Sequence, residues 1–194
     1  MNNTEILYDH YKETVDITKN MENKRNKAFV IIIIHISVLL LMSYRPESLC
    51  NTIKDYLMGQ WEIGFYFSMN IIQTIIMLSL LYCVVRYYQF NIHIEKAYPY
   101  IHKLEERLSK LINEKIERES NNYLKQYPKT QDLVYYTYKY IFPFLFIFAL
   151  IYRFIFNNTW DNPMVKIAEL FITTILIVIN VVYTIDMYNQ GKNN

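Results

Sequence analysis

The sequence predicts an all-α integral membrane protein with four transmembrane helices in two hairpins and a long cytoplasmic helical connector. Three observations lead to this fold class. Hydrophobic residues make up 53% of the 194 residues. Mean hydropathy is nevertheless only +0.02, because the apolar residues are gathered in four blocks with the charged residues between them. The Lys and Arg residues, finally, are very unevenly divided among the polar segments.

The four apolar blocks are residues 28–44, 63–85, 136–156 and 165–188. A membrane span needs about 20 predominantly apolar residues, or about 17 where flanking cations snorkel to the interface, so the first block is short and the others are comfortable. A soluble helical bundle is disfavoured, because nothing amphipathic lies between the members of each pair to cover helices that are apolar all round. A cleaved signal peptide is disfavoured because the leader is rich in acidic residues and no small-residue cleavage site follows.

The blocks divide the chain into five parts. We expect a cytoplasmic N-terminal helix at 1–27, a first transmembrane hairpin at 28–85 with an outer loop at 45–62, a cytoplasmic helical connector at 86–135, a second transmembrane hairpin at 136–188 and a cytoplasmic tail at 189–194. Sixteen Lys and Arg residues lie in the N-terminal segment, residues 86–139 and the tail, against four in or beside the two short loops, namely Arg45, Lys54, Arg153 and Lys166. The positive-inside rule therefore predicts that both termini and the connector are cytoplasmic.

The connector contains an amphipathic helix. Five apolar residues recur at helical spacing, and charged residues occupy the opposite face. The apolar residues are Ile101, Leu104, Leu108, Leu111 and Ile112. Pairs such as Glu106 with Lys110 satisfy part of this charge, so a merely solvated face is one interpretation. The other is that converging subunits bind an anionic ligand, such as a nucleotide or a short oligonucleotide, or a partner protein. The candidate binding residues are Lys103, Arg107, Lys110, Lys115 and Arg118.

Polar residues form a stripe on each of two predicted spans. The second span carries Asn70, Gln73 and Thr74 within about 100° of arc, and the fourth carries Glu169, Thr173, Asn180 and Thr184 within about 60°. In lipid such groups must bond across a helix interface or line water. The stripes are thus either interhelical hydrogen-bonding positions or the lining of a pore. A pore would require several subunits, because four spans cannot enclose a wide channel.

Three other residues of the predicted spans lead to specific expectations. Arg153 should either snorkel to the nearby interface or pair with an acid at a similar depth, such as Glu169. His35 should hydrogen bond to a neighbouring helix rather than act as a proton or ligand site. Pro143 should bend or restart the inner end of the third span, because proline lacks a backbone donor.

The sequence contains none of the common catalytic motifs. There is no phosphate-cradling glycine loop, no H-E-x-x-H, no C-x-x-C and no nucleophile elbow. The His residues do not stand at metal-ligand spacing with one another or with Cys and acidic residues. We therefore expect no enzyme activity, no catalytic residue, no metal and no cofactor, and we expect Cys50 and Cys83 to be structural thiols.

Four short segments carry a resemblance to a known group of proteins. They are KRNKAF at 24–29, YIHKLEERLS at 100–109, YLKQYP at 123–128 and YIFP at 140–143. In these segments and in layout the chain resembles small four-pass membrane proteins of bacterial anti-phage defence systems, namely the Kiwa and Hailong membrane subunits and the SLATT effectors. The SLATT effectors have a two-span core, so the second hairpin is a departure from them. The resemblance implies a tetrameric or similar inner-membrane assembly, held silent by a cytoplasmic partner or nucleotide-derived ligand.

These observations lead to two functional expectations. The first is an oligomeric inner-membrane effector of anti-phage defence, channel-like or membrane-disrupting, gated through its cytoplasmic connector by a nucleotide-type ligand or a partner. The second is a non-conducting membrane sensor or scaffold that recruits a cytoplasmic defence effector. Both place the chain as a multi-pass homo-oligomer in the lipid bilayer of the bacterial inner membrane.

Overall fold

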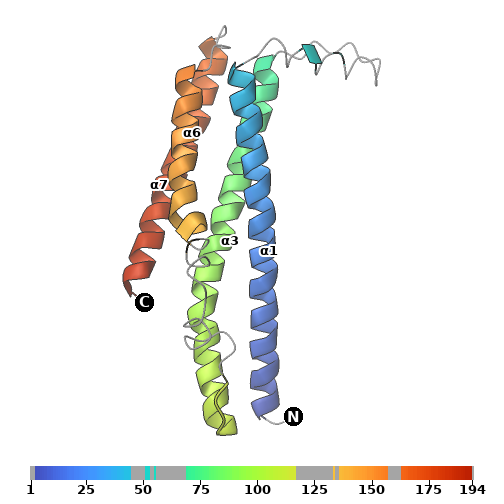
Figure 1. Cartoon of the computed structure of the whole chain (residues 1–194), viewed down its shortest axis with the longest axis vertical. Coiled ribbons are helices and arrows are strands. Elements are labelled where there is room, and N and C mark those ends of the chain that lie inside the picture. The colour runs from blue at the N-terminus through green and yellow to red at the C-terminus, as the bar shows by residue number, and fades with distance from the viewer. Residues whose placement is uncertain are drawn as a thin grey trace. The chain divides into compact units, whose positions relative to one another are not determined.

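The computed structural model describes residues 3–44, 51–52, 55, 69–116, 133, 136–156 and 163–193, except for the side chains of 69–70 and 190–193. Most of the predicted outer loop at 45–62, the side chain of Asn70 and all of Arg118 therefore lie outside the described residues. Helices account for all the regular structure in the described part, which contains no strand. They are α1 (Asn3–Tyr44), α3 (Met69–Ile112), the short π-helix η1 (Thr137–Ile141), α6 (Phe142–Phe156) and α7 (Pro163–Asn193), shown in Figure 1.

Four stretches of helix are long and apolar enough to cross a membrane. They are Asn3–Tyr44, Ile71–Ile112, Thr137–Phe156 and Pro163–Asn189. The all-α prediction and the prediction of four helices with the length and composition of membrane spans are confirmed at this level. The chain has the architecture of a multi-pass membrane protein.

The helices α1 and α3 are much longer than a membrane span, at 42 and 44 residues. Where the sequence predicts a polar helix at 1–27 followed by a separate span, the structure has one uninterrupted helix. In the same way α3 continues past Val85 into the predicted connector. No glycine or proline stands at either transition, so nothing in the backbone interrupts the helical hydrogen bonds there. Pro99 is accommodated inside α3.

The described chain divides into two compact units. Unit 1 comprises Met1–Ala28 and Arg86–Ile141, and unit 2 comprises Phe29–Val85 and Phe142–Asn194. Two of the unit boundaries fall within a residue of the places where the sequence changes from charged to apolar, at 28 and 85. The helices α1 and α3 each pass from one unit into the other without a break.

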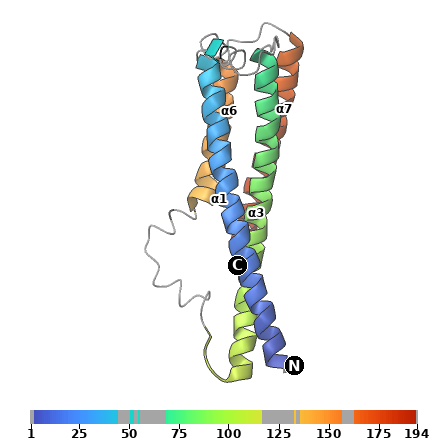
Figure 2. The same cartoon turned by 90° about the vertical axis from the view of Figure 1, so that its right-hand side faces the viewer.

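In unit 1, the first part of α1 packs against the second part of α3. The two run side by side in Figures 1 and 2. Their cluster of buried side chains consists of Tyr11, Val15, Ile101, Leu104 and Leu108. The predicted apolar face of the connector is therefore buried over Ile101, Leu104 and Leu108, whereas Leu111 and Ile112 beyond it are exposed.

The end of α3 has an identifiable local cause. Asn113 follows the last helical residue with a φ of 58°, in the left-handed region that asparagine tolerates better than most residues. The Ser109 hydroxyl then accepts a hydrogen bond of 2.9 Å from the backbone N–H of Ile116. The chain is thereby folded back over the last turn of the helix, as at other helix C-termini.

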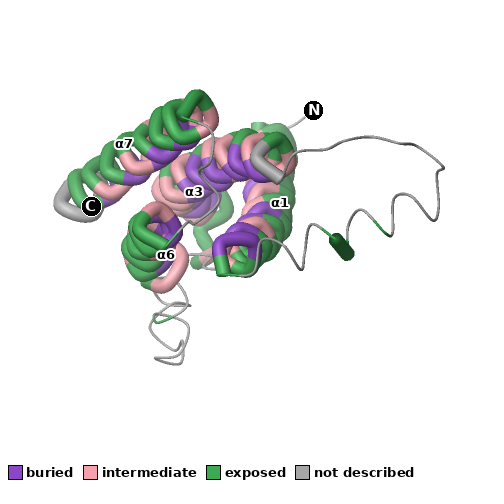
Figure 3. Tube along the Cα trace, turned by 90° about the horizontal axis from the view of Figure 1, so that it is seen from above, coloured by how far each residue is buried: buried purple, intermediate pink, exposed green. Residues whose placement is uncertain are grey.

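Unit 2 contains the apolar parts of α1 and α3 together with α6 and α7. Figure 3 shows buried residues along one side of each helix and exposed residues along the other. The largest buried side chains include Ile32, Leu39, Met77, Phe146 and Leu176. The outward faces are also apolar, with Phe144, Phe148 and Phe171 more than 60% exposed. Apolar surface on this scale suits a lipid environment, in which it carries no hydration cost.

The helix type changes just before Pro143. The π-helix η1 ends at Ile141 and α6 begins at Phe142. Proline has no N–H to donate, and its ring would clash with the carbonyl group four residues earlier in a regular α-helix. The wider π-helical turn accommodates both effects. The expectation that Pro143 restarts the inner end of the third span agrees with this change.

Replacing Asn113 tests the account of the end of α3. Asn113→Val should lower the stability of unit 1 by about 1–2 kcal/mol, because a β-branched residue is strained at positive φ. Asn113→Gly should leave it unchanged or slightly higher. The measurement is thermal unfolding of the full chain in detergent, followed by circular dichroism. Equal melting temperatures for the two variants would contradict this account.

Candidate functional site

A buried charged cluster joins three helices of unit 2. Arg153 of α6 donates from Nη2 to the Glu169 Oε1 of α7 at 3.1 Å and to the Gln73 Oε1 of α3 at 3.5 Å. The side chains of Arg153 and Glu169 are only 4% and 1% exposed. The predicted pair between these two residues is therefore confirmed, and Gln73 joins it from the second span.

Burial makes each member of this cluster dependent on the others. An unpaired charge inside an apolar bundle costs several kcal/mol, and the cost is offset only when the partner charge and its hydrogen bonds are in place. Because Nη2 carries two N–H groups, this one nitrogen of Arg153 can donate to two helices at once. The cluster therefore favours one register of α3, α6 and α7 over others that would leave a charge alone. Arg153 Nε is buried and has no hydrogen-bond partner in the described residues.

A second polar contact holds the middle of α7. Asn180 Nδ2 donates to the backbone carbonyl of Pro143 at 3.2 Å. Thr184 donates back to the Asn180 carbonyl one turn earlier at 2.9 Å, so its hydroxyl is satisfied within its own helix. The Asn180 Oδ1 atom is buried and has no partner in the described residues.

The two predicted polar stripes thus lie on the inner sides of their helices in unit 2. Gln73, Glu169, Thr173 and Asn180 are buried, and Thr74 and Thr184 are half-buried. Gln73 and Glu169 meet through Arg153, whereas Asn180 contacts α6 separately. The sequence allowed these residues to be either interhelical hydrogen-bonding positions or the lining of a pore. The contacts of Gln73, Glu169 and Asn180 are interhelical hydrogen bonds.

The His35 contact is the one expected from the sequence. Its Nδ1 lies 2.8 Å from the carbonyl oxygen of Ile31, and its Nε2 lies 3.0 Å from the Ser79 hydroxyl of α3. Because a carbonyl oxygen can only accept, Nδ1 carries the proton in this arrangement. His35 therefore links α1 to α3 within unit 2. Ser79 was the partner that the sequence could not identify.

Unit 1 contains polar contacts that the sequence reasoning missed. Tyr11 donates to the buried Glu105 carboxylate at 2.8 Å, and Tyr98 donates to Glu22 at 2.8 Å. These two pairs connect α1 to α3 and show that the helices run antiparallel. The only sequence signal for them is an acid at 105 on the face that also carries Ile101 and Leu108, where a charge needs a partner.

The π-helix η1 is held to α1 and α3 by three contacts. The buried Lys139 ammonium lies 3.0 Å from Glu95. The Arg25 guanidinium stands 4.5 Å over the ring of Tyr138, and Tyr87 donates to the backbone carbonyl of Tyr138 at 2.9 Å. Residues from three separate segments therefore meet at η1. No periodic pattern in the sequence identifies this meeting point.

Three of the predicted ligand-binding cations, Lys103, Arg107 and Lys110, lie along the outer side of α3, and Lys115 follows the end of this helix. All four are exposed, and Arg118 falls outside the described residues. Lys110 forms the expected ion pair with Glu106 at 2.6 Å. The hydrogen bond and positive charge of Lys110 lower the pKa of the Glu106 carboxyl group. These residues form an open basic surface.

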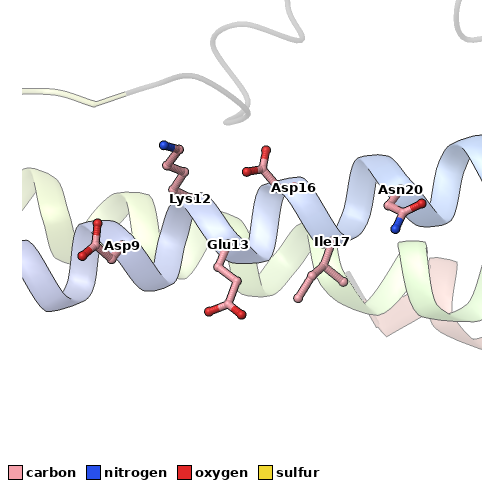
Figure 4. A pocket seen from close by; sticks show the side chains of 6 residues that line it. All are labelled: Asp9, Lys12, Glu13, Asp16, Ile17 and Asn20. Carbon is pink, nitrogen blue, oxygen red and sulfur yellow. The ribbon is translucent and has the colours of Figure 1, made fainter.

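A shallow depression runs along the outer side of α1. The described residues that line it are Asp9, Lys12, Glu13, Asp16, Ile17 and Asn20, shown in Figure 4. All six belong to one helix, and their side chains fan out to both sides of it. Among the described residues, no group of three or more His, Cys, Asp or Glu side chains could hold a metal ion.

Comparison with known proteins identifies no relative of this chain. No protein-family model matches the sequence, and no curated protein and no solved structure matches it.

Removing one or both charges of the buried pair tests its role in unit 2. Arg153→Met leaves the Glu169 carboxylate buried without its cation and should destabilise the bundle by about 3–5 kcal/mol. The double variant Arg153→Met with Glu169→Leu should cost much less, because no unpaired charge remains. The measurement is unfolding of detergent-solubilised protein by a denaturing detergent. The single variant Glu169→Leu completes the cycle. If the double variant loses as much stability as the two single variants lose together, the pairing is contradicted.

Proposed function

We propose that this protein is a membrane-embedded sensor or scaffold of a bacterial anti-phage defence system, in which unit 1 receives a cytoplasmic signal and unit 2 holds the protein in the inner membrane. The observation that carries the proposal is the continuity of α1 and α3 through both units. The signal would be a partner protein or a nucleotide-type ligand. The exposed cations of α3 are the surface that such a ligand or partner would contact.

Continuous helices are suited to carry a signal between the units. Every turn is fixed by backbone hydrogen bonds, so a shift of α1 against α3 in unit 1 displaces the same two helices where they continue into unit 2. A ligand that binds one arrangement of the pair more tightly than another would shift the population toward it. The contacts of η1 with both helices supply a third segment that would respond to the same shift.

Two further observations support the cellular setting. Sixteen of the 20 Lys and Arg residues fall in the N-terminal segment, residues 86–139 and the tail, which supports cytoplasmic termini and a cytoplasmic connector. The segments KRNKAF, YIHKLEERLS, YLKQYP and YIFP resemble membrane proteins of anti-phage systems. This resemblance implies an oligomeric assembly, and we propose that this chain assembles with copies of itself.

The non-conducting interpretation is favoured by the way the polar residues are used. Gln73, Glu169 and Asn180 are almost completely buried within a single copy of unit 2. Arg153 and the Pro143 carbonyl occupy them as hydrogen-bond partners. Side chains engaged in this way stabilise the bundle and are turned away from the surface that further copies would contact.

Loss of stiffness at the unit boundary tests the relay. Asn26→Gly with Lys27→Gly should weaken or abolish protection of cells against phage, because each glycine costs the helix about 1 kcal/mol relative to alanine and loosens it locally. The matched control, Asn26→Ala with Lys27→Ala, removes the same side chains but keeps the helix. The readout is plating efficiency of phage, alongside the amount of protein in the membrane fraction. Equal protection by both variants would contradict the relay.

A channel-like effector is the second candidate, and one observation favours it. Arg153 Nε and Asn180 Oδ1 are buried polar atoms without a protein partner in the described residues. Such atoms commonly bond to water. A water-containing path along α7 in an assembled, activated state would use the polar stripe of Thr173 and Asn180 as its lining.

Ion flux separates the two candidates. If α7 lines a conducting path, Thr173→Leu with Asn180→Leu should abolish depolarisation of cells during infection without loss of assembly, because two polar groups of the path become apolar. The measurement is a membrane-potential dye in infected cells, with Thr174→Leu on the exposed side of α7 as the control. Flux that persists in the double variant would exclude α7 as the lining.

A further inference from the structure

The outer face of α1 in unit 1 is acidic. Asp9, Glu13 and Asp16 are all exposed, and they recur every three or four residues, which places them on one side of the helix. The side chains that face α3, Tyr11 and Val15 among them, lie on the opposite side at about 100° of rotation per residue. We call the three acids the acidic face.

The outer face of α3 in unit 1 has the opposite charge. It is formed by an exposed stripe at a spacing of three and four residues: His93, Lys96, Tyr100, Lys103, Arg107 and Lys110. The side chains of α3 that are buried against α1, such as Ile101 and Leu108, lie on another side of the helix. Among the described residues, the acid that forms an ion pair with this stripe is Glu106, which holds Lys110. We call these six residues the basic face.

We propose that a second copy of this chain is the partner of both faces, with the acidic face of one copy docked on the basic face of the next. The argument is charge complementarity between two stripes on one unit, each of which lies outside the apolar contact between α1 and α3. A two-fold dimer through either stripe would bring like charges together, which is unfavourable. A head-to-tail contact avoids this, and repeated around an axis it closes into a ring.

The spacing of the charges agrees with such a contact. Asp9 and Asp16 are seven residues apart in the sequence, and so are Lys96 and Lys103. Seven residues are close to two full helical turns, so the two members of each pair lie on the same side of their helix. The two acids can therefore face the two lysines of a neighbouring copy at the same time.

The proposal rests on the proposed insertion of all copies in one membrane with one orientation, which also determines the register. Copies at equal depth meet at equal heights. Within one copy, Tyr11 contacts Glu105 and His10 contacts Tyr100. Asp9 is therefore within about three residues, or about 4.5 Å of rise, of the height of Lys103.

The same reasoning sets a second pair. Glu22 contacts Tyr98 within one copy. Averaged over this contact and the two above, Asp16 lies level with about residue 99 of α3, which is about three residues or about 4.5 Å of rise from Lys96. Lys side chains span such offsets readily. The expected intermolecular pairs are thus Asp9 with Lys103 and Asp16 with Lys96. The shallow depression beside Asp9 and Asp16 provides space for the incoming lysine side chains.

The strength of this contact should depend on salt. Exposed ion pairs are individually weak, and screening at high ionic strength reduces them further. Confinement of all copies to one membrane raises their effective concentration and compensates for the weakness of each pair. An assembly of this kind forms and separates easily, as a regulated assembly requires.

Charge reversal on the full-length chain in liposomes tests the proposal. Asp9→Lys with Asp16→Lys, and separately Lys96→Glu with Lys103→Glu, should each weaken self-association by about tenfold or more, since two attractive pairs become repulsive. The quadruple variant, which reverses both faces, should restore it. Self-association is measured by energy transfer between donor- and acceptor-labelled copies, which does not depend on the carboxylates and amines that the substitutions exchange. Zero-length carbodiimide cross-linking with mass spectrometry of the linked peptides then identifies the paired residues in the unchanged chain and in the quadruple variant.

A matched control reverses charge without opposing the contact. Lys12→Glu with Lys19→Glu changes two exposed lysines beside the acidic face and should leave self-association unchanged or stronger. Unaltered association in both double variants would overturn the proposal, and so would loss of association that the quadruple variant fails to restore. The two proposals can fail separately. If the charge-reversal variants behave as expected but the glycine variant Asn26→Gly with Lys27→Gly still protects cells against phage, only the proposed relay is contradicted.

Discussion

The buried ion pair between Arg153 and Glu169 is the interaction on which the arrangement of unit 2 depends. In lipid, the apolar faces of helices gain little by leaving their surroundings, so packing alone selects neighbours weakly. A charge that must meet its partner selects them strongly, because the alternative is an isolated ion in an apolar medium. Gln73 extends the pair to a third helix. The His35 contact with Ser79 adds the fourth.

Unit 1 is stabilised by a different balance of forces. Its apolar cluster is small, with Tyr11, Leu104 and Leu108 at its centre. Polar contacts between α1 and α3 complete it, and Glu105 lies buried among apolar side chains with Tyr11 as a donor. A unit with so thin a core leaves most of its side chains outside. Its outer faces carry exposed charges, acidic on α1 and basic on α3.

The two units share α1 and α3, and these shared helices are the basis of the proposed relay of a signal from unit 1 to unit 2. No hinge residue separates the polar and apolar parts of α1, and none separates those of α3 at Val85. Unit 2 is specified by pairs that tolerate few alternative registers. Unit 2 would therefore respond to a change in the contact between α1 and α3 in unit 1 by passing from one packing arrangement to another. A small number of discrete arrangements is what distinguishes a switch from a gradual distortion.

The sequence by itself determined which segments are helical and which are apolar. Block length and hydropathy depend only on local composition, so the four helices of spanning length were predictable, as were the Arg153 pairing and the inner face at Ile101 and Leu108. Tertiary structure alone decided where those helices begin and end across the unit boundaries. It also decided the partners: Gln73 for Arg153, Ser79 for His35 and Tyr11 for Glu105. These partners come from distant parts of the chain, and the choice among many polar side chains depends on three-dimensional register, which periodicity along one helix does not contain.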